Sequence, residues 1–222
     1  MYEFLYLKIG LLMLVCWIIL FFLKPAQRKE MMITSLLGGI AGPIQELWYT
    51  KDYWSPSYFG NWPWIEDILF GFSVFGVTAI FYEVFIGSRI KEVADKDQHP
   101  LVFLSLTLIG TIGMGLFVPV VNSIYAAIIS FIIVWAIIIT FRKDLFIPSL
   151  ASAVLITVFA FLGYKVVLAA NPGIIEAWWM LKNISGILIS GIPLEEYLWF
   201  FTEGLAFGTL YEFWQGIEFK KA

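Results

Sequence analysis

Long apolar segments separated by short polar ones dominate the chain. A helix needs about 20 mostly apolar residues to cross the hydrocarbon core of a bilayer. Apolar segments of about that length lie near residues 4–23, 32–49, 66–87, 101–120, 122–141, 146–168 and 195–215. The pattern therefore predicts an all-α membrane protein, in which seven transmembrane helices form a single domain over residues 1–222.

The distribution of lysine and arginine predicts the direction of these helices. Basic residues are enriched in the cytoplasmic loops of membrane proteins. With the N-terminus outside, ten of the 14 basic residues fall in inner segments: Lys24, Arg28, Lys29, Arg89, Lys91, Lys96, Arg142, Lys143, Lys220 and Lys221. We therefore expect an external N-terminus and a cytoplasmic C-terminus.

Two stretches, residues 42–85 and 172–214, share a pattern of aromatic and acidic residues. The matched residues are Glu46, Trp48 and Tyr49 with Glu176, Trp178 and Trp179, Glu66 and Asp67 with Glu195 and Glu196, Leu69 with Leu198, Phe72 with Phe201, and Tyr82 and Glu83 with Tyr211 and Glu212. A constant offset of 129 to 130 residues indicates an internal duplication. It predicts two parallel three-helix repeats, about 1–90 and 122–216, joined by a connector helix at about 101–120.

Acidic residues cluster at the outer ends of the predicted helices. Six lie there: Glu46, Glu66, Asp67, Glu176, Glu195 and Glu196. Glu203 follows Glu196 by seven residues, which places it on the same helix face and about 10 Å deeper. By contrast, Glu83 and Glu212 are expected at the inner surface, in an interfacial role.

Two explanations of the outer acids are open. The helix dipole stabilises carboxylates at helix N-termini by about 0.3–1 kcal/mol, so Glu195 and Glu196 after Pro193 fit an ordinary helix start. A carboxylate at the bilayer centre, however, costs at least ~2.5–3.5 kcal/mol, and clustered acids reduce that cost by holding protons. A neutral carboxylic acid beside an ionised one suits acid–base chemistry, and the duplication of the pair favours this second explanation.

Aromatic residues near the outer ends also allow two interpretations. They are Trp48, Tyr49, Tyr53, Trp54, Trp62, Trp64, Trp178 and Trp179. Tryptophan and tyrosine form belts at membrane interfaces. Aromatic faces also stabilise cations, so the same side chains would suit a reaction that passes through a carbocation.

Composition narrows the chemistry. Hydrophobic residues make up 60% and charged residues 14% of the chain, against roughly 45–50% and 25% in soluble domains. With Cys16 and His99 as the only cysteine and histidine, neither a disulfide nor a zinc site is expected. The sequence contains no dinucleotide-binding motif and no P-loop. We therefore expect no metal, no cofactor and no nucleic-acid partner.

The segment IPLEEYLWFF, residues 192–201, follows a Trp-Trp pair and begins an apolar run. It resembles the signature of the integral-membrane lycopene cyclase domain, a family of heterodimeric bacterial, fused archaeal and fungal bifunctional enzymes. The resemblance is strong over residues 172–214 and weaker over the repeat copy at 42–85, which reads WIED where the motif has PLEE.

This resemblance implies a redox-neutral isomerase (an intramolecular lyase) of carotenoid biosynthesis. Such an enzyme cyclises the ψ-end group of a linear carotenoid to a β-ionone ring through a carbocation. The candidate catalytic acids are Glu195, Glu196, Glu66 and Asp67. The candidate substrate-binding residues are Glu46, Trp48, Trp178, Pro193, Tyr197, Phe201 and Glu203.

The expected partners are a lipophilic polyene and membrane lipid, with carotenoid-pathway enzymes or a second copy of the chain as further partners. The expected location is the cell membrane of a prokaryote. Two other functions stay open: a carotenoid- or polyisoprenoid-binding protein without activity, and a proton-coupled transporter that uses the carboxylates. A retinal-binding receptor is not favoured, because the last predicted helix has no lysine in its middle.

Overall fold

The structure, a computed structural model, describes residues 2–59, 64–86, 89–92 and 114–219. The described chain is mostly helical. Its helices are α1 (Leu5–Leu23), η1 (Pro25–Gln27), α2 (Arg28–Asp52), α3 (Trp64–Phe85), α5 (Ser123–Phe141), η2 (Lys143–Leu145), α6 (Phe146–Ala170), α7 (Ile174–Trp178), η3 (Leu181–Asn183), α8 (Leu194–Phe207) and α9 (Leu210–Gln215). Two short antiparallel pairs join β1 (Arg89–Glu92) to β4 (Ile217–Phe219) and β2 (Leu188–Ile189) to β3 (Ile192–Pro193).

Four described helices are long and apolar enough to cross a membrane. They are α1, α3, α5 and the continuous segment Lys143–Ala170 that contains α6. These helices coincide with four of the predicted apolar segments, those near 4–23, 66–87, 122–141 and 146–168. The prediction near 32–49 falls inside α2, which contains Pro43 and Glu46 and is not among the four. Most of the predicted connector helix, residues 101–113, lies outside the described residues.

The prediction of one continuous helix over 195–215 is wrong. The chain forms α8 and α9 instead, with Gly208 and Thr209 between them. At 1.5 Å per residue, the 14 residues of α8 are about 21 Å long, shorter than the ~30 Å hydrocarbon core. Glycine weakens a helix, and a β-carbon at Gly208 would lie 2.3 Å from the β-carbon of Ser152, so the close approach to α6 requires glycine there.

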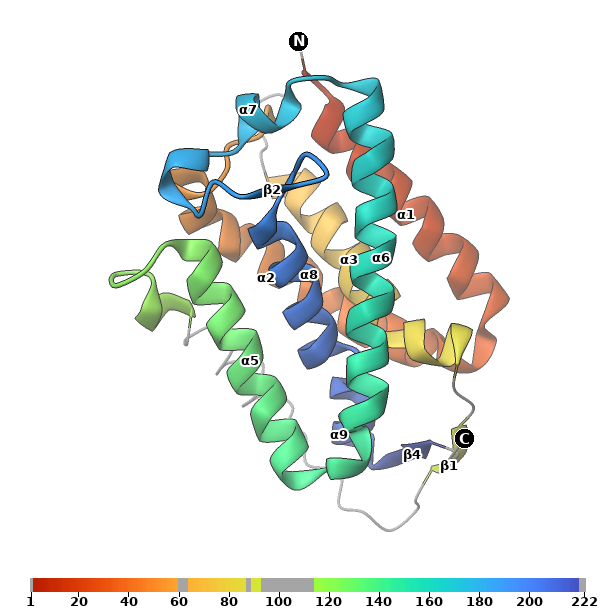
Figure 1. Cartoon of the computed structure of the whole chain (residues 1–222). Coiled ribbons are helices and arrows are strands. Elements are labelled where there is room, and N and C mark those ends of the chain that lie inside the picture. The colour runs from red at the N-terminus through yellow and green to blue at the C-terminus, as the bar shows by residue number, and fades with distance from the viewer. Residues whose placement is uncertain (1, 60–63, 87–88, 93–113, 220–222) are drawn as a thin grey trace.

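The helices pack as two groups around α3 and α8. In one group, α1 and α2 pack against α3; in the other, α5 and α6 pack against α8. The groups meet where α3 contacts α6 and α8. In Figure 1, α8 lies between α5 and α6, which diverge upward from their shared end, and the two termini lie at opposite ends of the molecule.

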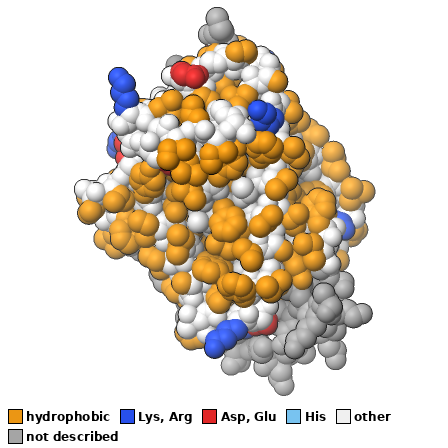
Figure 2. Space-filling view, in the orientation of Figure 1, with side chains coloured by type: hydrophobic (Ala, Val, Ile, Leu, Met, Phe, Trp, Pro, Cys, Tyr) orange, Lys and Arg blue, Asp and Glu red, His pale blue; other side chains and the backbone are white. Residues whose placement is uncertain are grey.

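The outside of this bundle is apolar. Many large hydrophobic side chains are exposed along α1 and α6, for example Leu12, Phe22, Leu162 and Val166. Figure 2 shows hydrophobic side chains over most of the visible face, with charged side chains mostly near its edges. A surface of this kind is typical of a protein surrounded by lipid.

Candidate active site

A cavity of about 70 Å³ lies among the upper ends of α2, α3, α6 and α8. Three carboxyl groups line it: Glu46 from α2, Asp67 from α3 and Glu196 from α8. The rest of the lining is largely aromatic and includes Tyr6, Tyr49, Tyr53, Trp54, Phe70, Phe75, Tyr164, Trp199 and Phe200. The cavity therefore combines acids from both predicted repeats with a wall of rings.

Glu196 is the most heavily hydrogen-bonded of the three carboxyl groups. Its Oε2 accepts a hydrogen bond from the hydroxyl of Tyr164 at 2.6 Å. Its Oε1 accepts one from Trp179 Nε1 at 2.8 Å and a short one from the hydroxyl of Tyr53. A carboxylate only accepts hydrogen bonds, so three donors around one buried group match its ionised form.

The other two acids have fewer donors. Within the described residues, Asp67 has one donor, the hydroxyl of Tyr6, 2.9 Å from Oδ1. Glu46 accepts from Trp54 Nε1 at 2.9 Å and from the hydroxyl of Tyr58 at 3.1 Å. Burial, and after it the neighbouring Glu46, raises the pKa of the Tyr58 phenol, which therefore keeps its proton and remains a donor.

Glu66 and Glu195, the first members of the two acidic pairs, do not line the cavity. Both oxygens of Glu66 accept from the backbone N–H of Phe59, at 3.1 and 3.2 Å. Glu195 Oε1 accepts from the hydroxyl of Tyr125 at 2.6 Å and from the backbone N–H of Ser185 at 2.9 Å. Successive residues of a helix project about 100° apart. In each pair, therefore, the first acid accepts a hydrogen bond from the backbone of a loop, and the second acid faces the cavity.

Three of the other predicted site residues are buried but do not line the cavity. Trp178 is buried, and its ring meets the rings of Tyr6 and Trp54 edge-on. Pro193 is buried and forms the N-cap of α8. Glu203 is buried deeper in α8, where Oε2 accepts from the hydroxyl of Thr78 at 2.9 Å.

The remaining predicted residues do not line the cavity either. Trp48 is half-buried on α2 and is not part of the lining. Tyr197 donates a hydrogen bond to the carbonyl of Ile189 at 3.0 Å. Phe201 is half-buried and is not part of the cavity lining, and Glu176, the sequence match of Glu46, is exposed on α7.

Sequence reasoning missed the hydrogen-bond donors of the site. Tyr6 and Tyr164 are tyrosines inside apolar segments, and that polar hydroxyl in an apolar run was a usable signal. Tyr53 and Trp179 were noted only among the interfacial aromatic residues. Nothing in the sequence indicated that both donate to one carboxylate, because they come from segments 126 residues apart.

A second acidic cluster lies at the other end of the bundle. Carboxylate oxygens of Glu30, Glu83 and Glu212 lie within 4.8 Å of one another, and all three residues are buried. The expectation that Glu83 and Glu212 are interfacial is therefore wrong: they are 8% and 1% exposed. Among the described residues, this is the group whose spacing suits a metal ion, and the expectation of a metal-free protein stays a prediction.

A family of known proteins matches part of the chain that forms the site. The model of the lycopene cyclase family matches residues 122–214, a segment that contains α5, α6, α8, Glu196 and its donors Tyr164 and Trp179. Searches of curated proteins and of solved structures found no match. The family match confirms the resemblance and supports a membrane protein with a carotenoid cyclase-type function in general. Over residues 122–214, the chain is therefore similar to the lycopene cyclase family.

Proposed function

We propose that the protein cyclises the ψ-end group of a linear carotenoid such as lycopene to a β-ionone ring. The observation that carries the proposal is the aromatic cavity in which Asp67, Glu46 and Glu196 meet. Cyclisation needs a proton donor, a proton acceptor, stabilisation of a cation and exclusion of water. The cavity supplies a group for each of these needs.

Asp67 is the proton donor in this proposal. It adds a proton to the terminal double bond of the substrate, and a tertiary carbocation forms. The neighbouring double bond attacks that cation and closes a six-membered ring, so one carbon–carbon σ bond replaces one π bond and a second tertiary cation forms in the ring. Asp67 suits the role because Tyr6, its one donor among the described residues, bonds Oδ1 and leaves the second oxygen available to carry the proton.

Glu196 is the proton acceptor. Its three donors hold it as an anion, and an anion near the ring cation both stabilises the charge and removes a ring proton to form the new double bond. One proton enters and one leaves, so the reaction is redox-neutral. Return of the proton from Glu196 to Asp67 restores the starting state.

The aromatic wall stabilises the intermediate cations. Tyr49, Phe70, Phe75, Trp199 and Phe200 present rings to the cavity. A cation over an aromatic face gains about 2 kcal/mol or more in a desolvated site. Because these rings are apolar, they also keep water from capturing the cation as an alcohol.

The reaction as proposed calls for no cofactor. Its proposed location is the cell membrane of a prokaryote, where polyene and lipid are its partners. A second copy of the chain or other carotenoid enzymes are further proposed partners.

Expression in a host that accumulates lycopene tests the proposal. Pigments are extracted and separated by chromatography, and the amount of folded protein is measured in the same membranes. Loss of lycopene with the appearance of β- or γ-carotene is the expected result. Unchanged lycopene in membranes that contain well-folded protein would reject lycopene as the substrate.

A proton-coupled transporter is the second candidate, favoured by the depth at which acids occur. Glu203 lies between the acids that line the cavity and the cluster of Glu30, Glu83 and Glu212, and all of these groups are buried. A transporter of this kind would move protons into vesicles that contain the purified protein, and Glu203→Gln would stop that movement. Proton flux equal to that of empty vesicles would reject this candidate.

A further inference from the structure

A second, smaller pocket lies between α6 and α8, on the other side of Glu196 from the active-site cavity. We call it the α6–α8 pocket; its volume is about 10 Å³. Ala160 and Phe161 of α6 and Tyr197 of α8 contribute to its lining. All three are half-buried, so the pocket lies at the outside of the bundle.

The two spaces share a wall. Tyr164, Glu196 and Phe200 line both the active-site cavity and the α6–α8 pocket. The wall contains the 2.6 Å hydrogen bond from the Tyr164 hydroxyl to Glu196 Oε2. A molecule in the α6–α8 pocket would therefore be separated from the active-site cavity by two side chains and the reacting carboxylate itself.

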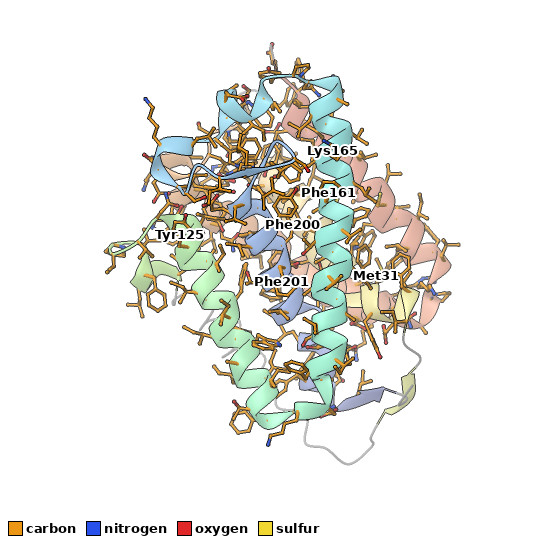
Figure 3. The ribbon with its side chains drawn as sticks, viewed as in Figure 1. Met31, Tyr125, Phe161, Lys165, Phe200 and Phe201 are labelled. Atoms are coloured by element: carbon orange, nitrogen blue, oxygen red, sulfur yellow. The ribbon has the colours of Figure 1, made fainter. Side chains whose placement is uncertain are left out.

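The helices that form the pocket are in close backbone contact at one end and are bridged by large side chains at the other. A β-carbon at Gly204 would lie 2.5 Å from the Cα of Ala153, so α6 and α8 are in close backbone contact there. Toward the outer end the rings of Phe161 and Tyr197 lie 6.3 Å apart, and Phe161 and Phe200 approach the space between the two helices (Figure 3). The pocket thus opens between these side chains, away from the backbone contact at Gly204.

The surroundings of this opening are apolar. Val158, Leu162 and Leu198, on the same two helices, are 50%, 56% and 38% exposed. A hydrocarbon dissolved in the bilayer would reach the opening without crossing water, whereas a polar ligand would have to pass between exposed apolar side chains and aromatic rings. The chemistry of the opening therefore fits a linear polyene.

We propose that the α6–α8 pocket is the subsite through which a polyene chain extends from the active-site cavity into the lipid, and that Phe200 separates the two spaces until the substrate displaces its ring. The nature of the occupant rests on the proposed function; the position of the subsite rests on the shared wall. With a chain in place, the reacting end lies beside Glu196 and the remainder lies between α6 and α8.

The first test adds bulk to the pocket. Ala160→Phe fills the space between α6 and α8, while Gly163→Phe, on the same helix, adds the same ring at a position with no neighbour within 4 Å. Because the added ring occupies the space that the polyene chain needs, kcat/KM of Ala160→Phe is expected to fall about tenfold, which equals about 1.4 kcal/mol. Gly163→Phe is expected to retain the wild-type value, and equal kcat/KM in the two variants would overturn the subsite.

The second test is reversible and compares one protein with itself. In a Cys16→Ser background, Phe161→Cys and Tyr197→Cys place thiols on opposite sides of the opening, and a short bifunctional thiol reagent joins them. Cross-linking is expected to stop turnover, and reductive release of the reagent to restore it. Unchanged turnover in fully cross-linked protein would overturn the proposal even where Ala160→Phe fails to fold.

Failure of the subsite and failure of the proposed reaction give different results. Binding of lycopene to Glu196→Gln protein is followed by the change in its visible absorption, which needs no turnover. Loss of that binding in Glu196→Gln/Ala160→Phe protein supports the subsite whether or not the wild type forms rings. Ring formation by the wild type together with full activity of the cross-linked protein keeps the function and rejects the subsite.

Discussion

Two adjacent carboxyl groups of α8 have different surroundings. Glu196 faces the cavity and accepts from three side-chain donors, whereas Glu195 accepts from Tyr125 and the backbone of Ser185 outside it. The same division separates Asp67 from Glu66 on α3. Chemistry is therefore expected from the second acid of each pair and loop anchoring from the first.

Amide substitutions test this division. Glu196→Gln removes the proposed proton acceptor, and we expect ring formation to fall by at least about 10²-fold. Glu195→Gln keeps an oxygen that accepts from Tyr125 and Ser185, so its activity per folded protein is expected to stay close to that of the wild type. Pigment chromatography normalised to protein amount measures both. The opposite order of activities would move the catalytic role to Glu195.

The donors of Glu196 allow a second test. Tyr164→Phe removes one of its hydrogen bonds and, at about 1–3 kcal/mol for a bond to a buried charged group, is expected to lower kcat about tenfold or more. Tyr125→Phe removes a bond of the same length from Glu195 and serves as the matched control. Equal losses of kcat in the two variants would show that Tyr164 acts only through the stability of the fold.

At the scale of elements, close helix contacts position the acids. A β-carbon at Gly42 would lie 2.4 Å from the carbonyl oxygen of Asp67, so this glycine lets α2 approach α3 beside the cavity. Gly204 likewise allows α8 to approach α6 closely. Small residues at such positions are typical of helices that pack in a membrane.

Thermal unfolding in detergent measures the importance of these contacts. Gly204→Val would force a side chain against the backbone of Ala153, and we expect a loss of about 1–3 kcal/mol or failure to fold. Gly163→Ala meets nothing within 4 Å and is expected to stabilise the protein by about 0.5–1 kcal/mol. A Gly204→Val protein as stable as the wild type would mean that α6 and α8 separate without loss.

The sequence predicted the long helices better than it predicted their interruptions. Uniform apolar runs located α1, α3, α5 and α6 within a few residues. The break at Gly208 was missed because a glycine in an apolar run also fits close helix packing. Here Gly208 both ends α8 and allows the close contact with Ser152 of α6. In the site, Glu46, Asp67 and Glu196 were recognised from charge in an apolar context. Their donors were not, because hydrogen bonds between distant segments leave no local pattern.

At the scale of the molecule, the two helix groups have matching elements. Helices α1, η1 and α2 contain 19, 3 and 25 residues, and α5, η2 and α6 contain 19, 3 and 25. Acids that match between the two stretches come together at both ends of the bundle. Asp67 and Glu196 line the cavity, and Glu83 and Glu212 belong to the second acidic cluster with Glu30. The internal repeat stays a prediction. In one respect the matching is uneven, since Glu46 lies within α2 and its sequence match Glu176 lies in α7.

One cavity shared by both groups predicts the order of products. A rigid polyene about as long as the ~30 Å hydrocarbon core cannot place both ends in one cavity. A carotenoid with one ring should therefore appear before a carotenoid with two, and it should exchange with added unlabelled material. A chromatographic time course with labelled lycopene tests this order. A two-ring product without any free one-ring intermediate would contradict it.

The three donors of Glu196 link its carboxylate to several segments at the end of the bundle that contains the cavity. Tyr53 follows α2, Tyr164 belongs to α6 and Trp179 follows α7, at sequence separations of 143, 32 and 17 residues from Glu196. Local loosening of any of these segments would alter the reacting group while the helices remain folded. On heating, ring formation should therefore be lost at a lower temperature than the helical circular dichroism signal. The protein is thus expected to lose its activity before its helices unfold.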